Sequence, residues 1–381
     1  MSSDPILESG SSTALEDAEP AQTAGVVLLR FAVALVVPVL SFAALWVTFE
    51  FLRNTDANRL IVVAVALIVG VVGVWLLYWG MNLVVSQLPD RIATGVRPAV
   101  FVGPAVVILS VYLVYPAVNT IVISFMDDKS ESFVWFENYV DLFTEGAYLI
   151  AIRNSVIWVI IVPFMAVAVG LGFAVLVDRL GRRTESAAKS MIFLPMAISM
   201  VGASIVWRFI YSFRPPGFGE QIGLLNGIWT ALGNNPVAWL LQEPWNNLYL
   251  MVILIWLQTG FAMVILSSAI KSVPADLLEA GRIDGATEWQ VFWRIVFPSI
   301  SSTIVVVTTT IVITVWKVFD IVWVMTGGKF GTSVIAEKMI TEFFLFRNAG
   351  TGAALAVLLF VAVIPIMIIN VRKFREQEAT R

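Results

Sequence analysis

Eight long apolar runs constrain this chain most strongly, because each is long enough for a helix to cross the hydrocarbon core of a bilayer. The runs lie at about residues 26–49, 60–85, 98–125, 151–177, 190–213, 247–270, 299–326 and 352–371. Hydrophobic residues make up 59% of the chain and charged residues 13%, whereas soluble domains carry about 25% charged residues. The sequence therefore predicts an all-α integral membrane protein with about eight transmembrane helices.

The chain has no cysteine and no histidine, which excludes most chemistry that relies on reactive side chains. Thiolate nucleophiles, histidine bases, proton relays through histidine and thiolate or imidazole metal sites are all absent. We predict no catalytic residue and no metal site. The net charge of -3 also gives no basic field for nucleic acid.

Composition divides the chain into four parts. Residues 1–24 are acidic, rich in Ser and Ala and free of aromatics, which predicts a disordered cytoplasmic tail. Residues 25–97 contain two runs with little polar content, interpreted as two peripheral transmembrane helices. Residues 98–371 carry polar groups, prolines and aromatics within their runs and are predicted to form a six-helix core. Residues 372–381 form a basic tail, predicted to be cytoplasmic.

Lysine and arginine in the loops predict the orientation. Loop 178–189 holds four lysines and arginines and loop 271–298 holds three, whereas loop 126–150 is acidic and loop 214–246 is nearly uncharged. Loop 327–351 contains three basic residues and would lie outside, against the rule, but the longer inner loops outweigh it. With eight spans, both termini are predicted to be cytoplasmic.

Segment 274–298, PADLLEAGRIDGATEWQVFWRIVFP, lies between two runs and is predicted to form a helix–turn–helix at the membrane face. Asp276 with Glu279, and Thr287 with Gln290, have the spacing of capping boxes that open two helices. Gly285 permits a sharp turn between them. The charged residues Glu279, Arg282, Asp284 and Glu288 are expected to surround an exposed patch of small residues, namely Ala280, Gly281, Gly285 and Ala286. Without further information the segment could equally be a surface hairpin.

The order Glu279-Ala280-Gly281, Asp284-Gly285-Ala286, Ile295 and Pro298 resembles the EAA loop of ABC importer permeases. Gly281 departs from that pattern, where alanine is usual. Further segments, WFENYVDLF (135–143), Phe193-Leu194-Pro195 and KVFDIVWVMTGG (317–328), make residues 98–375 similar to the maltose-type sugar permeases, and most of all to their α-glucoside and glucosylglycerol branch.

This resemblance implies a type I ABC importer permease fold in a bacterial or archaeal cytoplasmic membrane. It implies that Glu279, Ala280, Gly281, Asp284, Gly285 and Ala286 form the coupling helix that docks on an ATPase. The implied partners are a second homologous permease, two cytoplasmic ATPase subunits, an extracytoplasmic sugar-binding protein, membrane lipid and a di- or oligosaccharide. The chain has no Walker A motif, G-x-x-x-x-G-K-[ST]. ATP and Mg would therefore be bound by the partner subunits, and this chain would hold no cofactor.

Polar groups within the apolar runs are candidates for the substrate path, since they are costly in a bilayer. Lys317 and Asp320 have i,i+3 spacing, and Trp316 and Trp323 flank them. They could form a structural ion pair or bind sugar hydroxyls. Gln258 and Phe261, which the resemblance places on the sugar cavity, could contact sugar or only a neighbouring helix.

Two wider alternatives remain at this point. Loop 214–246 contains three tryptophans and could form an interfacial aromatic belt, a docking surface for a binding protein, or both. The chain could also be a stand-alone secondary transporter or channel for a polar solute, although it has few ionisable groups within the runs for ion coupling. An intramembrane enzyme is disfavoured by the lack of paired carboxylates, His and Cys.

Overall fold

The structure is a computed structural model that describes residues 24–55, 58–86 and 90–379. The predicted N-terminal tail, except Ala24, lies outside the described residues. Regular structure in the described part is helical, and one isolated antiparallel bridge joins Met126 to Phe133. The all-α prediction is therefore confirmed.

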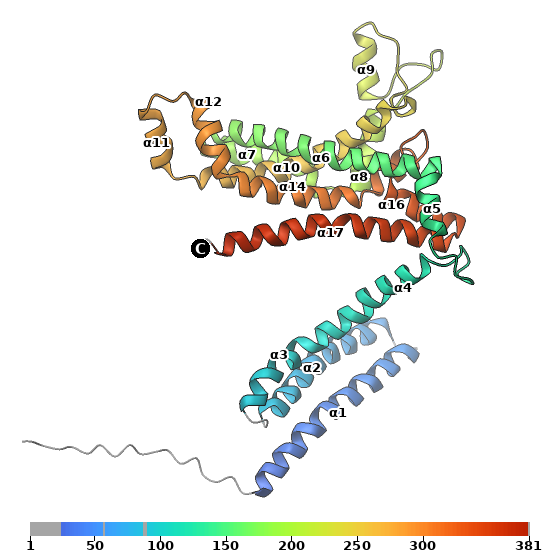
Figure 1. The fold of residues 1–381 in the computed structure, drawn as a ribbon, viewed down its shortest axis with the longest axis vertical. Helices are drawn as coiled ribbons and strands as arrows, with labels where there is room; N and C mark the ends of the chain where they lie inside the picture. Colours follow the sequence, from blue (N-terminus) through green and yellow to red (C-terminus); the bar gives the residue numbers. More distant parts are fainter. Residues whose placement is uncertain (1–23, 56–57, 87–89, 380–381) are drawn as a thin grey trace, which may run out of the picture. The chain divides into compact units, whose positions relative to one another are not determined.

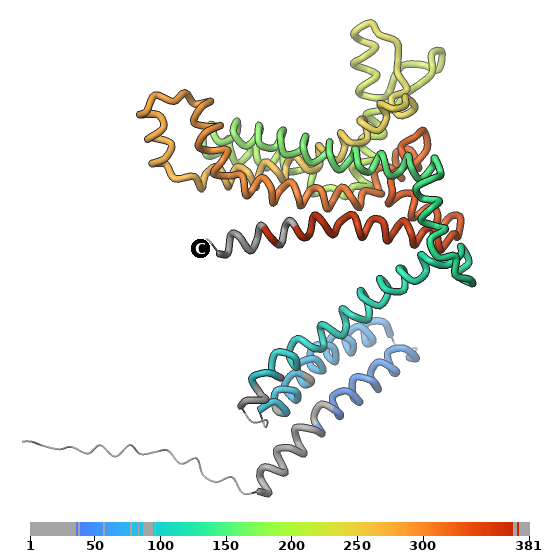
Figure 2. The backbone as a smooth tube through the Cα atoms, viewed as in Figure 1, coloured from blue at the N-terminus to red at the C-terminus, as the bar shows by residue number. Residues whose placement is uncertain are grey.

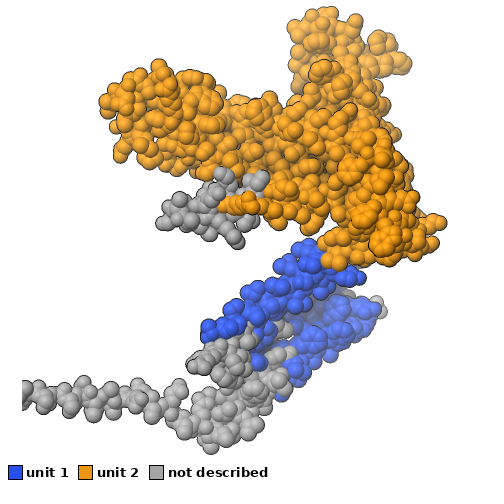
Figure 3. Space-filling model, viewed as in Figure 1, with its two compact units in different colours: residues 1–116 blue, residues 117–381 orange. Residues whose placement is uncertain are grey.

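The chain divides into two compact units, residues 1–116 and 117–381 (Figure 3). The division falls within the third apolar run, whereas the change in composition lies near residue 97. The first unit contains α1 (Ala24–Asn54), α2 (Arg59–Ser86), α3 (Asp90–Leu109) and the π-helical turn η1 (Ser110–Val114). Helix α2 contacts both α1 and α3, and the Tyr78 and Phe101 rings stack with centroids 6.1 Å apart.

Each of the eight predicted runs falls in a helix or in a helix broken by a bend. Within the described residues, five helices are long and apolar enough to cross a membrane, or up to seven if each of two bent pairs is one span. The five are Arg59–Ser86, Arg97–Ile123, Gly146–Asp178, Trp245–Lys271 and Ala349–Ile368. The bent pairs are Arg182–Ala197 with Met200–Ile210, and Glu288–Ser299 with Ser301–Trp316.

The second unit is organised around α6 (Gly146–Asp178) and α10 (Trp245–Lys271), which lie side by side (Figures 1 and 2). A Cβ atom placed on Gly170 would lie 2.6 Å from the Ala262 Cβ and 3.0 Å from the Met263 backbone nitrogen. Small residues thus let the two backbones approach, which is how membrane helices gain close packing. Buried side chains from α6, α8, α10, α14 and α15 complete this core.

The fifth run bends because its backbone is interrupted at Pro195. Helix α7 (Arg182–Phe193) passes into the short 3₁₀ turn η2 (Leu194–Ala197), and α8 (Met200–Ile210) follows at 100°. The Ser199 hydroxyl accepts a hydrogen bond from the Gly202 N–H and caps α8. Gly260 of α10 lies against the Ile192 carbonyl at this bend, where a side chain would clash.

The seventh run is also broken. Helix α14 (Ser301–Trp316) ends at Lys317, and the short α15 (Asp320–Met325) begins after Phe319. Helix α14 contacts α6, α10 and α17 (Ala349–Ala379), whereas α15 contacts α8. Helix α17 continues to Ala379, so the described part of the predicted C-terminal tail, residues 372–379, is helical and continuous with the last apolar run.

The second unit has two distinct ends (Figure 1). One end carries α11 (Ala275–Ile283), α12 (Glu288–Val291), the π-helical turn η4 (Phe292–Val296) and α13 (Phe297–Ser299). The other end carries α5 (Glu137–Thr144), α9 (Leu224–Ala231), η3 (Trp239–Leu241), α16 (Ile335–Ile340) and η5 (Thr341–Phe346). Helix α4 (Tyr115–Ile123) leads into this second end.

Loop 327–334, which precedes α16, is held in place by buried asparagines. Asn154 of α6 donates hydrogen bonds to the carbonyls of Gly331 (2.7 Å) and Ser333 (2.8 Å). Asn246 and Asn247 of α10 donate to the carbonyls of Phe330 (2.7 Å) and Gly331 (3.2 Å). Loop 327–351 therefore lies at the same end as loops 126–150 and 214–246, as predicted despite its basic residues.

Candidate functional site

The α11–α12 hairpin lies at the end of the second unit and is built by local backbone signals. The Thr287 hydroxyl accepts a hydrogen bond from the Gln290 N–H (3.3 Å), and the Gln290 side chain accepts one from the Thr287 N–H (2.8 Å). This reciprocal capping box opens α12, as predicted. At the end of α11, Gly285 has a φ of +82°. Its N–H donates to the Arg282 carbonyl and the Ala286 N–H donates to the Gly281 carbonyl, both at 3.0 Å, which is a Schellman turn.

The predicted capping box of Asp276 and Glu279 is wrong. Helix α11 begins at Ala275 after Pro274, and no side chain caps it. Pro274 marks the change from extended backbone to helix in place of a side-chain cap. Asp276 then lies in the first turn, where its negative charge interacts favourably with the helix dipole.

The small residues of the hairpin do not form one exposed patch. Ala280 and Gly285 are exposed, but Gly281 and Ala286 are half-buried. A Cβ atom on Gly281 would lie 2.6 Å from the Ile295 Cδ1, so α11 rests closely on η4 at this point. Together with Leu278, these residues pack on the cluster that contains Val291 and Val296. The small side chains therefore hold the hairpin against the spans.

The opposite face of α11 is exposed, apolar at its centre and acidic around it. Ile283 is 85% exposed although it is a large aliphatic side chain, and Leu277, about 120° around the helix from it, is 50% exposed. Glu279 lies four residues before Ile283, on the same side of the helix, and Asp284 follows it. Glu279 makes no hydrogen bond or ion pair within the part of the chain that the structure describes. Such a face has the chemistry of a docking surface for a partner with an apolar pocket and basic groups.

Arg282 links the two helices of the hairpin. Its Nε and Nη2 atoms donate to the two carboxylate oxygens of Glu288 at 2.8 and 3.2 Å. This hydrogen bonding to Glu288 raises the pKa of Arg282 above its usual value. Both side chains are exposed, so the pair orients the hairpin more than it stabilises the fold.

A second charged cluster joins the spans beside the hairpin. The Lys271 ammonium contacts the carboxylates of Glu185 (2.5 Å) and Asp178 (3.5 Å), and Lys189 also contacts Glu185 (2.6 Å). These residues come from the ends of α6, α7 and α10. Loops 178–189 and 271–298 thus share one end of the molecule, as the orientation analysis requires.

The expected ion pair of Lys317 and Asp320 is absent: the structure forms none between these two described residues. The helix breaks between them, so i,i+3 geometry does not apply. Lys317 caps the C-terminal end of α14 and Asp320 lies in the first turn of α15. Each charge instead complements the dipole of its own helix end. Lys317 is exposed and Asp320 is half-buried.

The two tryptophans near this break have different surroundings. Trp316 packs against the cluster formed by α5, α6, α16 and α17, and its buried indole nitrogen has no hydrogen-bond partner. Trp323 is 36% exposed and stacks on Phe319, with ring centroids 5.5 Å apart. The two tryptophans that flank Lys317 and Asp320 in the sequence are therefore divided between a packed interior and an exposed surface.

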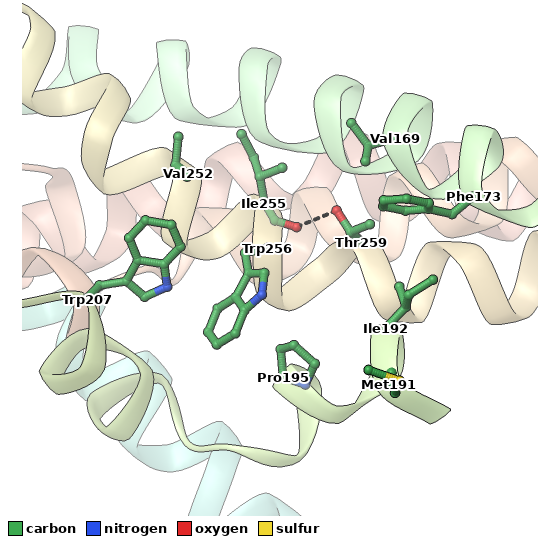
Figure 4. Close-up of a pocket in the computed structure, with 10 residues that line it drawn as sticks. All are labelled: Val169, Phe173, Met191, Ile192, Pro195, Trp207, Val252, Ile255, Trp256 and Thr259. Carbon is green, nitrogen blue, oxygen red and sulfur yellow. Dashed lines mark hydrogen bonds between the residues drawn. The ribbon is translucent and has the colours of Figure 1, made fainter. Parts of the chain in front are cut away.

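A cavity of about 440 Å³ lies under the bend of α7 and α8, against α6 and α10 (Figure 4). Trp207 of α8 and Trp256 of α10 form one wall, with ring centroids 5.8 Å apart. Trp207 Nε1 is buried without a hydrogen-bond partner, and Thr259 donates its hydroxyl hydrogen to the Ile255 carbonyl (2.7 Å). The remaining lining is apolar, from Phe173, Met191 and Pro195 among others.

Gln258 and Phe261 do not line this cavity, although both are on α10. Successive helix residues turn by about 100°, so Phe261 lies on the far side from Trp256 and Thr259. It packs against the core, and Gln258 is half-buried. Trp207 was missed by sequence reasoning because it is separated from Trp256 by a loop and by a bend of the chain. A buried indole in a bent span is the signal that could have found it.

Among the described residues, no group of three or more Asp or Glu side chains is arranged to hold a metal ion. The cavity offers stacking surfaces with few polar groups.

Comparisons with known proteins agree on one family. Residues 166–373 match the model of the binding-protein-dependent transport system inner membrane component. The chain is 54% identical over 281 residues to the osmoprotective compounds uptake permease protein GgtC of Synechocystis sp., covering 74% of this chain and 100% of that protein. It is 43% identical over 331 residues to the alpha-glucoside transport system permease protein AglF of Rhizobium meliloti, covering 83% and 97%.

The fold is also shared with a solved structure. A chain of a bacterial ABC transporter involved in the import of the acidic polysaccharide alginate superposes with a TM-score of 0.65 at 20% identity, covering 75% of this chain and 99% of that one. The matched family region contains the cavity, the α11–α12 hairpin and the broken seventh run. The chain therefore belongs to the family of binding-protein-dependent transport inner membrane components, and is a non-catalytic permease subunit of an ABC importer.

Proposed function

We propose that this permease carries an α-glucoside-like di- or oligosaccharide across a bacterial or archaeal cytoplasmic membrane. Two relatives support this proposal, one a permease of an alpha-glucoside transport system and the other a permease for uptake of osmoprotective compounds. An extracytoplasmic binding protein would deliver the sugar, and a second homologous permease would complete the path.

The exposed face of α11 is the observation that carries the coupling role. Ile283 is 85% exposed beside the unpaired Glu279 carboxylate, which fits a partner pocket that is apolar at its base and basic at its rim. We infer that this face docks on one of two cytoplasmic ATPase subunits, which bind ATP and Mg. The small residues Gly281 and Ala286 set how closely α11 packs on η4, and the turn at Gly285 sets the angle between α11 and α12.

For the substrate path we propose the six residues named from the sequence and two more from the structure: Gln258, Phe261, Trp316, Lys317, Asp320 and Trp323, with Trp207 and Trp256 added. Sugar C–H faces stack on aromatic rings, and the Trp207–Trp256 wall offers such a surface. Trp316 is the weakest member, because it packs within the interior cluster.

The orientation remains a proposal that rests on charge. Loops 178–189 and 271–298, with seven lysines and arginines between them, would face the cytoplasm, with both termini on that side. Loop 214–246, which carries α9, would then lie outside, where its exposed Leu224 (61%) and Ile228 (54%) could contact the binding protein. Helices α1 and α2 would be peripheral to the path.

The test is ATP hydrolysis by the complex in lipid nanodiscs, with the binding protein added empty or loaded with an α-glucoside such as maltose, trehalose or sucrose. We expect hydrolysis to rise only with the loaded binding protein, and Trp256→Ala to lower sugar transport while ATPase subunits stay bound. Phe360→Ala, at an exposed site on α17, is the matched control. Transport of an α-glucoside by this chain without ATPase subunits would contradict the proposal and favour a stand-alone transporter.

A further inference from the structure

A groove of about 500 Å³ lies between the C-terminal half of α6 and the α12–η4 segment, separate from the cavity described above. Leu171 and Val175 of α6 form one wall. Trp289, Phe292 and Trp293 form the other, with the two tryptophan ring centroids 5.5 Å apart. Trp289 contacts Phe292 and Trp293 but is still 70% exposed, so a large part of its aromatic surface is uncovered within the described chain.

The floor of the groove is open because of a glycine. A Cβ atom on Gly172 would meet nothing within 4 Å. Gly170 lies two residues earlier, on the opposite side of α6, and packs against α10. The two glycines therefore differ in purpose, since Gly170 permits helix packing and Gly172 leaves space on the outer face of α6.

One end of the groove carries Arg179, which lies near the Glu288 carboxylate but forms no ion pair with it in the described part of the chain. Arg179 follows the last residue of α6 and lines the groove with Glu288. Both oxygens of the Glu288 carboxylate already accept hydrogen bonds from Arg282. Arg179 makes no ion pair or side-chain hydrogen bond within the ranges that the structure describes. An anion from outside the chain could therefore bind it.

The groove is apolar along its walls and carries a cation at one end, so its polarity is complementary to that of an anionic phospholipid. Its wall belongs to α6, which is long and apolar enough to span a membrane. Its cation stands just beyond the last residue of that helix, where a spanning helix meets the headgroup region, and its tryptophans are residues that favour the membrane interface. An apolar trough with a cation at one end matches one acyl chain and an anionic headgroup.

We propose that this groove binds a membrane phospholipid with an anionic headgroup, whose phosphate meets Arg179 and whose acyl chain lies along Gly172 against Trp289 and Trp293. The bound lipid would also brace the coupling hairpin, because Trp289 follows Glu288 directly and Glu288 is tied to Arg282 of α11. The proposal does not depend on which sugar is carried.

The test is native mass spectrometry of the purified importer complex titrated with 1-palmitoyl-2-oleoyl phosphatidylglycerol or with phosphatidylcholine of the same chains. We expect the wild-type complex to bind phosphatidylglycerol more tightly. Arg179→Gln should weaken phosphatidylglycerol binding by about tenfold, as expected for one charge-assisted hydrogen bond, and remove the preference between the lipids. Gly172→Leu should block the binding of both lipids at this site.

Arg182→Gln is the matched control, since Arg182 begins α7 and does not line the groove. It should bind both lipids as the wild type does. Unchanged phosphatidylglycerol binding in Arg179→Gln and Gly172→Leu, or equal wild-type affinity for both lipids, would overturn the proposal. Release of the second permease by Gly172→Leu would also overturn it, because the groove would then be a subunit interface.

Discussion

Replacement of Gly285 by valine tests whether the turn of the coupling hairpin governs coupling. Gly285 has a φ of +82°, and a left-handed conformation costs a residue with a Cβ about 1–2 kcal/mol, with more for a β-branched side chain. Alternatively the turn can open and lose the hydrogen bonds of Gly285 to Arg282 and of Ala286 to Gly281. Each is worth about 1 kcal/mol. Either route costs about 2 kcal/mol, which corresponds to a decrease of about 30-fold in the equilibrium constant for forming the native turn.

The apparent affinity for the ATPase subunits should therefore fall by up to about 30-fold in Gly285→Val, since only the native turn presents Ile283 and Glu279 together. Pull-down of the ATPase subunits at graded concentrations measures this affinity. Membrane insertion should be unchanged, because Gly285 lies outside the candidate spans.

Gly285→Asn separates conformation from side-chain bulk, because asparagine adopts the left-handed region more readily than other residues with a Cβ. We expect Gly285→Asn to stay close to the wild type. Equal loss in Gly285→Asn and Gly285→Val would mean that the partner touches this position directly. Wild-type affinity in Gly285→Val would refute the role of the turn.

Three further predictions concern the fold and the orientation. Asn154→Leu leaves the buried carbonyls of Gly331 and Ser333 without their donor, at a cost of about 1–3 kcal/mol. Amide hydrogen exchange in residues 326–335 should therefore be faster in Asn154→Leu but not in Asn234→Ala, which changes an exposed residue. Equal exchange rates in the two variants would show that Asn154 does not hold this loop in place. Gly170→Ala overpacks the contact of α6 with α10, which should destabilise the fold by about 1–3 kcal/mol and lower the melting temperature of the complex. Gly172→Ala has open space around its Cβ and should leave the melting temperature unchanged. Equal melting temperatures would show that the helices separate without cost. Because the native chain has no cysteine, Ser186→Cys should resist an impermeant thiol reagent in intact cells and Asn234→Cys should react, and the reverse pattern would invert the proposed orientation.

Local signals in the sequence were sufficient for much of the coupling hairpin. The turn at Gly285 and the capping box of Thr287 and Gln290 depend on residues within five positions of one another, so their spacing could be interpreted directly. The inward packing of Gly281 could not, because it depends on Ile295 of the following segment. Pro274 likewise supplied the start of α11 in place of the expected side-chain cap.

Long-range contacts explain what the sequence did not reveal. Lys317 and Asp320 were interpreted on the assumption of a continuous helix, and the break at residues 317–319 separates them. Asn154 binds the backbone of Gly331, 177 residues away, and nothing in the sequence near either residue indicates that pairing. The Trp207–Trp256 wall of the cavity similarly depends on the 100° bend that brings α8 over α10.

The most direct test of the central claim is cross-linking from Ile283 to the ATPase subunit. Ile283→Cys places the only thiol of the chain at the most exposed point of α11, and Phe218→Cys places one at the opposite end, where Phe218 is 76% exposed. A short bifunctional thiol reagent is applied to the assembled complex in which each ATPase subunit carries a single cysteine beside its membrane-facing cleft. We expect a covalent adduct of permease and ATPase from Ile283→Cys and none from Phe218→Cys. An adduct from Phe218→Cys alone, or none from Ile283→Cys in a complex that retains its ATPase subunits, would contradict the assignment of this hairpin as the coupling element.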